Sequence, residues 1–109
     1  MIAVIFEAVP HPGRSRTYFD IAASLAESLG QVDGFISVER FESVTRPGRF
    51  LSLSFWRDEA AVAEWRAFGR HRAAQDAGRS QVFADYRLRV AEVRRDYGLS
   101  DREQAPARE

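Results

Sequence analysis

The order of strand and helix patterns is repeated in the two halves of this 109-residue chain, and this repeat limits the available folds most. In each half, a short apolar stretch with strand-like alternation precedes a segment whose apolar residues recur at helical spacing, and a further strand pattern follows. The segments are 2–9, 15–29 and 35–44 in the first half, and 50–56, 58–77 and 82–97 in the second. The predicted order of elements is therefore β-α-β-β-α-β.

Turn and cap residues mark the boundaries of these segments. The run Pro10-His11-Pro12-Gly13 predicts a loop, and Arg46-Pro47-Gly48-Arg49 predicts a hairpin turn that makes the flanking strands antiparallel neighbours. Asp58 suits the N-cap of the second helix, whereas Ser15 or Thr17 can cap the first. Segment 35–44 alternates in a way that predicts solvent at its far end, and we expect a bulge near Ala91 in the last strand.

Two similar halves of this order predict an α+β fold with the split βαβ, or ferredoxin-like, motif: four antiparallel strands with both helices on one face. The strands at 2–9 and 50–56 are apolar on both faces, and the chain has no further element to cover the second face. We therefore expect a homodimer in which the two sheets pack together. The ordered domain should span 1–98, and 99–109 should be a disordered tail because it lacks an apolar anchor.

Composition excludes several classes of function. Sixteen basic and sixteen acidic residues cancel, so the chain has no net field to attract nucleic acid or a membrane surface. The absence of cysteine excludes disulfides and thiolate metal sites and fits a reducing cytoplasm. No apolar run is long enough to span a bilayer. The sequence predicts a cytoplasmic domain whose partners are small molecules or a second copy of itself.

The stretch FLSLSFWRDEAAVAEWRAFGRHRAAQ, residues 50–75, contains the best candidate site. Trp65 lies on the apolar stripe of the predicted helix, where an aromatic residue is more often part of the core but can also stack on a flat ligand. Ser52 and Ser54 lie on one face of the preceding strand and leave room that a larger side chain would fill, or they merely allow close packing of helix and sheet. A pocket with an aromatic wall is thus one of two interpretations.

Three further residues could supply chemistry. His71 follows a possible hinge at Gly69 and lies between two arginines, which would keep it neutral and able to accept a proton if it faces the pocket rather than solvent. Arg87 and Arg89 either protect an edge strand or hold an anion. His11 has no partner at metal-ligand spacing, and nucleotide-binding motifs are missing, so we expect neither a metal nor a cofactor.

The stretches IAVIFEAVPHPG, GFISVERFES, residues 50–75 and FADYRLRV together resemble the antibiotic biosynthesis monooxygenase family of dimeric α/β barrels, from Ile2 to about Gly98. This resemblance implies a cofactor-independent oxidation of a small aromatic phenol or quinol by O₂. In that mechanism Trp65 stacks on the substrate, His71 accepts or relays a proton, and Arg87 or Arg89 stabilises the anion. The residues expected to contact the substrate are Phe6, Phe35, Ser52, Ser54 and Phe83.

Two alternatives remain open. The haem-degrading branch of the same superfamily has an Asn on the first strand and an iron-binding His about three turns after the Trp, but here Phe6 and Glu7 stand near the first position and Gln75 at the second. The other alternative is a non-catalytic dimer, which either binds a small apolar ligand or has a filled pocket. The filled pocket predicts that Trp65 is buried by Phe6, Phe35 and Phe55, without a cavity.

Overall fold

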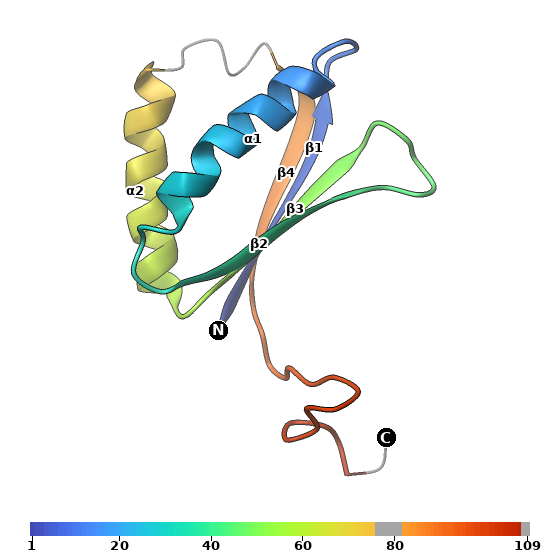
Figure 1. Cartoon of the computed structure of the whole chain (residues 1–109), viewed down its shortest axis with the longest axis vertical. Helices are drawn as coiled ribbons and strands as arrows, with labels where there is room; N and C mark the ends of the chain where they lie inside the picture. Colours follow the sequence, from blue (N-terminus) through green and yellow to red (C-terminus); the bar gives the residue numbers. More distant parts are fainter. Residues whose placement is uncertain (76–81, 108–109) are drawn as a thin grey trace.

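The computed structural model describes residues 1–75 and 82–107, with side chains described up to Phe68 and again from Val82. The described elements follow the order that the sequence predicts (Figure 1). They are β1 Ile2–Pro10, α1 Ser15–Leu29, β2 Phe35–Glu42, β3 Phe50–Trp56, α2 Glu59–Gln75 and β4 Phe83–Glu92.

The four strands form one antiparallel sheet in the order β2-β3-β1-β4. Both helices lie on the same side of this sheet, as Figure 1 shows. The α+β class, the ferredoxin-like order and the position of the helices are confirmed. Among the described residues, no helix has both the length and the apolar character that crossing a bilayer requires.

Register determines which residues face the helices. Arg40 pairs with Ser52, Ser52 with Phe6, and Phe6 with Leu88, so these four side chains form one row across the helix-covered face. The next row is formed by Val38, Ser54, Val4 and Val90. Because side chains alternate along a strand, the intervening residues lie on the opposite face, which we call the outer face.

The core consists of two separate clusters at opposite ends of the helix-covered face. One cluster contains Trp56, which is 1% exposed, with Ile2, Leu29, Ala61 and Val62. The second is formed by Ala8, Tyr18, Phe50 and Val82. On β3 the two clusters are separated by Ser52 and Ser54, whose side chains are too small to fill the space between the sheet and the helices.

The beginning of α2 agrees with the sequence, whereas the beginning of α1 does not. Asp58 Oδ1 accepts a hydrogen bond of 2.9 Å from the backbone N–H of Ala61. This bond, with Arg57 beside it, holds the pKa of Asp58 below its ordinary value. The residue that precedes α1 is Arg14, which makes no side-chain capping bond, so the predicted Ser15 or Thr17 cap is wrong.

The end of the chain also differs from the sequence prediction. Pairing of β4 with β1 is regular through Ala91, and the irregularity lies instead between Val9 and Pro10, so the predicted bulge near Ala91 is wrong. A proline at this position has no N–H to donate to the ladder, which explains a disturbance at the end of the strand. Residues 93–107 leave the sheet and run away from the helices (Figure 1). Disorder of residues 99–109 stays a prediction.

Gly34, in the turn before β2, offers a test of how tightly α2 packs on the sheet. Its φ is +94°, and a Cβ there would lie 2.8 Å from Ala61 Cβ. Gly48 has a similar φ of +88° but nothing within 4 Å of the corresponding position. We expect alanine to cost about 1–2 kcal/mol of unfolding free energy at either glycine through backbone strain, and a further ~1–3 kcal/mol at Gly34 through overpacking.

Urea denaturation followed by tryptophan fluorescence measures this difference between Gly34→Ala and Gly48→Ala. Equal losses in the two variants would contradict a close contact between the turn and the first turn of α2.

Candidate functional site

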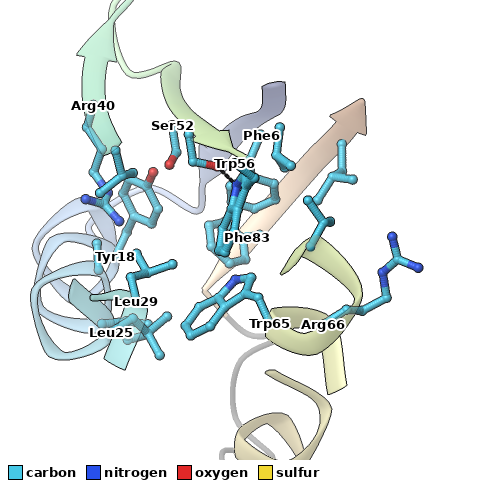
Figure 2. Close-up of a pocket in the computed structure, with 17 residues that line it drawn as sticks. Phe6, Tyr18, Leu25, Leu29, Arg40, Ser52, Trp56, Trp65, Arg66 and Phe83 are labelled. Atoms are coloured by element: carbon cyan, nitrogen blue, oxygen red, sulfur yellow. Dashed lines mark hydrogen bonds between the residues drawn. The ribbon is translucent and has the colours of Figure 1, made fainter. Parts of the chain in front are cut away.

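A cavity of about 420 Å³ lies between the two core clusters, enclosed by the sheet on one side and the helices on the other (Figure 2). This volume is in the range of ordinary small-molecule sites. Most of its lining is aliphatic or aromatic. The lining residues are Val4, Phe6, Tyr18, Ile21, Ala22, Leu25, Leu29, Val38, Arg40, Ser52, Ser54, Trp56, Val62, Trp65, Arg66, Phe83 and Leu88.

Two serines of β3 form the floor of this cavity, and they have different roles. Trp56 Nε1–H donates a buried hydrogen bond of 2.9 Å to Ser54 Oγ, which fixes the indole against the sheet (Figure 2). Ser52 makes no side-chain hydrogen bond to the described part of the chain and pairs across the sheet with Arg40. Ser52 therefore presents a hydroxyl at the cavity surface that no other described residue pairs.

Two tryptophans form the aromatic wall. Trp56 and Trp65 have ring centroids 6.3 Å apart with planes inclined by 31°, and Trp65 stacks on Phe68 at 5.5 Å. Trp65 is half-buried and packs against the cluster around Trp56 while also lining the cavity. A flat or apolar molecule in the cavity would contact both indoles.

The opposite end of the cavity is polar. Tyr18 is 4% exposed, and in Figure 2 its hydroxyl points toward Arg40 and Ser52. Burial raises the pKa of Tyr18, and the nearby Arg40 guanidinium offsets part of the rise. The buried Tyr18 Oη and Arg40 Nε nevertheless have no hydrogen-bond partner among the described groups.

The cavity brings together most of the residues predicted from the sequence. Phe6, Ser52, Ser54, Trp65 and Phe83 all line it. Phe35 does not: its ring packs edge-on against Trp56 at a centroid distance of 5.2 Å, within the core.

Arg87 and Arg89 lie on the outer face of the sheet, away from the cavity. Arg87 pairs with Glu7 and Arg89 with Ile5, whereas their neighbour Leu88 pairs with Phe6 on the helix side. Arg89 also forms an ion pair of 3.3 Å with Glu7. Within one chain the structure therefore does not bring these arginines to the substrate position that the sequence predicts.

His71 lies in the part of α2 whose side chains are outside the described residues, as does Gln75. The helix itself is continuous through Gly69 to Gln75, so the hinge that the sequence suggests does not interrupt it. The filled-pocket alternative is contradicted, because a cavity lies beside Trp65, and Phe55 is on the opposite face of β3 from Ser54.

Sequence reasoning missed Tyr18, Arg40, Trp56 and Arg66. Tyr18 lies within the first predicted helix and Arg40 within segment 35–44, whose alternation predicts solvent at its far end. The signal that could have identified Arg40 is its place in the alternation: Val38 and Arg40 share a face, and the hairpin turn at 46–49 places that face beside Ser52 and Ser54.

The described lining offers little to a metal or a haem. No group of three or more His, Cys, Asp or Glu among the described residues could hold a metal ion. The described lining also contains no His, Cys or Met, which are common axial ligands of haem iron, and Tyr18 is its one phenolate donor. Among the described lining residues, Tyr18 is therefore the one candidate ligand for haem iron.

These features define a small ferredoxin-like α+β domain with an internal cavity between its helices and its sheet. Residues 1–77 match the model of the antibiotic biosynthesis monooxygenase family, and the chain belongs to this family. The jasmonate monooxygenase ABM of Pyricularia oryzae is 50% identical over 93 residues, which are 85% of this chain and 43% of that protein. The chain thus spans less than half of that relative's length.

Solved structures agree in fold. An antibiotic biosynthesis monooxygenase family protein from Deinococcus radiodurans has a TM-score of 0.76 at 18% identity, over 91% of this chain and 98% of that one. A variant of MhuD with two manganese protoporphyrin IX molecules bound per active site has a TM-score of 0.71 at 22% identity, over 90% of this chain and 99% of that one. At these identities the likeness supports the fold alone.

The two floor serines allow a direct test of the site's geometry. Ser54→Ala removes the acceptor of the buried Trp56 N–H, and an unpaired buried donor costs about 1–3 kcal/mol of unfolding free energy. Ser52→Ala removes a hydroxyl that has no hydrogen-bond partner among the described residues, and we expect a change within about 0.5 kcal/mol. Urea denaturation of the two variants measures the difference, and equal effects would contradict the hydrogen bond between Trp56 and Ser54.

Proposed function

We propose that this chain is a monooxygenase domain that uses O₂ to oxidise a small, largely apolar substrate held in the cavity between the helices and the sheet. The observation that carries the proposal is the cavity itself, with Trp56 and Trp65 on one wall and polar groups at the opposite end. Membership of the antibiotic biosynthesis monooxygenase family supports the reaction class.

The substrate we propose is an aromatic phenol or quinol, and the reaction needs no cofactor. Loss of the phenolic proton gives an electron-rich anion that reacts with O₂ at a ring carbon. Loss of water from the resulting peroxide then gives a quinone, so a dihydroxynaphthalene plus O₂ yields a hydroxynaphthoquinone plus water. The substrate supplies all the electrons, and one oxygen atom enters the product.

Trp65 and His71 have separate roles in this mechanism. The indole of Trp65 supports the ring through stacking and excludes water from the anion. His71, six residues further along α2, is the proposed proton acceptor. Arg87 or Arg89 was the sequence-based candidate for stabilising the anion, and such a role would require access from outside the single-chain cavity because both lie on the outer face.

A second candidate substrate follows from one relative. The 50% identical protein from Pyricularia oryzae is named for jasmonate, so hydroxylation of a non-aromatic acid is the alternative for this chain. Hydroxylating a saturated carbon requires two electrons from an external reductant, whereas quinone formation does not. Consumption of reductant therefore distinguishes the two reactions.

Oxygen uptake with a dihydroxynaphthalene tests the proposed activity. We expect one O₂ consumed per quinone formed and, with ¹⁸O₂, one labelled atom in the quinone. Trp65→Ala should lower kcat/KM about ten-fold or more, because the lost aromatic contact and buried area contribute on the order of 1.5–3 kcal/mol. His71→Ala should lower kcat with little change in KM.

The matched control is Tyr97→Ala, which removes an aromatic ring in the C-terminal segment, stacked under Arg102. Its activity should equal that of the unmodified chain. Enzyme-dependent uptake that survives Trp65→Ala unchanged would overturn the placement of the substrate. If there is no uptake but haemin gives a saturable shift of its Soret band, the haem-binding alternative is favoured instead. Binding without either signal would favour a non-catalytic ligand-binding dimer.

We also propose that the domain functions as a homodimer through the outer face of its sheet. Ile5, Leu51, Leu53 and Phe55 give this face an apolar centre, and Glu7, Arg87 and Arg89 are its charged neighbours. Within the described chain, both helices cover the other face, so this apolar area is left for a second copy. A cytoplasmic location remains a prediction from composition.

Sedimentation at micromolar concentration should give twice the 12.4 kDa of one chain. Leu53→Glu places a charge at the centre of the outer face, and we expect it to produce monomers. Val44→Glu adds the same charge in the β2–β3 turn, where the side chain is 97% exposed, and should leave the dimer intact. A single 12.4 kDa species for the unmodified chain would rule out the dimer.

A further inference from the structure

The polar end of the cavity contains two buried hydrogen-bond donors that have no acceptor among the described residues. Tyr18 Oη and Arg40 Nε are both inaccessible to solvent, and neither has a hydrogen-bond acceptor within the described chain. The Arg40 guanidinium lies close enough to the Tyr18 hydroxyl to offset part of the rise in its pKa, but a guanidinium only donates hydrogen bonds and cannot accept the Tyr18 O–H. Tyr18 belongs to α1 and Arg40 to β2, so two elements present these groups at the same place (Figure 2). Buried polar groups are nearly always paired in folded proteins, so two unpaired donors at one cavity wall indicate a missing acceptor.

The charge of the cavity indicates what kind of acceptor this is. Its described lining contains two cations, Arg40 and Arg66, and no carboxylate. Arg66 is exposed, and Figure 2 shows its guanidinium pointing away from Tyr18 and Arg40. Arg40 is half-buried and forms no ion pair with any carboxylate of the described residues, although the chain as a whole is neutral. A permanent cation held in a largely apolar cavity favours a ligand that is already anionic.

The neighbours of this pair extend the subsite. Arg40 and Ser52 are direct cross-strand partners, and the Ser52 hydroxyl makes no hydrogen bond to another described residue. On the other side, the cavity continues along apolar side chains to the indoles of Trp56 and Trp65. The cavity is therefore polar and cationic at one end and aromatic at the other, and a complementary ligand has an oxyanion at one end and an apolar body.

We propose that Tyr18 and Arg40 form a carboxylate-binding subsite, and that the natural ligand is a small amphipathic acid whose apolar body lies against Trp56 and Trp65. One carboxylate oxygen accepts from Tyr18 Oη–H and the other from Arg40 Nε–H, which pairs both buried donors at once. The proposed subsite rests on the proposed function only because both treat the cavity as the substrate site. Tyr18 and Arg40 are positioning residues, and a phenol to be oxidised would carry this carboxylate as a separate group.

Calorimetric titration of the full chain with two matched probes tests the subsite. The probes are naphthalene-2-acetate, the carboxylate of naphthalene-2-acetic acid and an anion at neutral pH, and 2-naphthaleneethanol, its neutral counterpart with the same ring. We expect the acid to bind more tightly than the alcohol. Tyr18→Phe should weaken the acid roughly ten-fold and Arg40→Met roughly a hundred-fold, because hydrogen bonds to charged groups are the stronger class. Neither change should weaken the alcohol by more than about two-fold, well below the effect of one net hydrogen bond.

Arg46→Met is the matched control, since it removes the same charge from the exposed β2–β3 turn and should leave both affinities unchanged. Tyr18→Phe keeps the ring that contacts Phe50 and Phe83, so its unliganded melting temperature should be equal or higher, which separates lost binding from lost folding. Equal affinity for acid and alcohol, or an acid affinity that survives Arg40→Met, would overturn the subsite.

These binding results are independent of turnover. Selective acid binding without oxygen uptake would support the subsite and contradict the proposed oxidation. Oxygen uptake with neutral dihydroxynaphthalenes, together with no preference for the acid, would support the oxidation and contradict the subsite.

Discussion

The placement of two small side chains between two aromatic ones on the helix-covered face of β3 is the constraint on which the rest of the site depends. This face presents Phe50, Ser52, Ser54 and Trp56 in order. The two aromatic residues each belong to a separate core cluster, and the two serines between them contribute almost no volume. A protein interior is normally packed to the density of an organic crystal, so a gap of this size has to be enclosed by stable structure on both sides.

Two clusters provide that structure in different ways. Around Trp56, the hydrogen bond to Ser54 and the close approach of Gly34 to Ala61 attach the first turns of α2 to the sheet. Around Tyr18, the stability comes from aromatic contacts with Phe50 and Phe83 at centroid distances of 5.7 and 5.6 Å. The cluster around Trp56 joins both helices to the sheet through Leu29 of α1 and Ala61 and Val62 of α2, whereas the cluster around Tyr18 attaches α1, and the cavity lies between the two clusters.

The fold could be predicted from the sequence because its signals are local. Strand alternation, helical spacing and turn residues each depend on neighbours within a few positions, and together they determine the order of the elements. The serine floor and Trp65 could be predicted for the same reason, since both lie within residues 50–75. The position of Arg87 relative to the cavity could not be predicted, because its face depends on the register of β4 with β1. The sequence of β4 alternates between two faces, with Arg87 and Arg89 on one and Tyr86 and Leu88 on the other. This alternation does not show which face of the strand meets the helices.

The roles of Tyr18 and Arg40 could not be predicted from the sequence, for a different physical reason. Each has an ordinary local explanation, as a core aromatic on a helix and as a polar residue on an edge strand. Their shared environment arises only when α1 crosses the row formed by Arg40, Ser52 and Phe6. Contacts between elements that are far apart in sequence depend on tertiary packing, which local patterns do not encode.

The unpaired polar groups carry an energetic argument. Leaving a buried donor without a partner costs about 1–3 kcal/mol, and more where the group is charged, whereas a small domain is stable by only about 5–15 kcal/mol in total. A phenylalanine at position 18 would make the same ring contacts without that cost. By this argument the unpaired Tyr18 O–H and Arg40 Nε–H lower the stability of the unliganded domain, and the proposed carboxylate ligand would recover this free energy as affinity. The cavity is in this sense preorganised for an acceptor that the described residues do not supply.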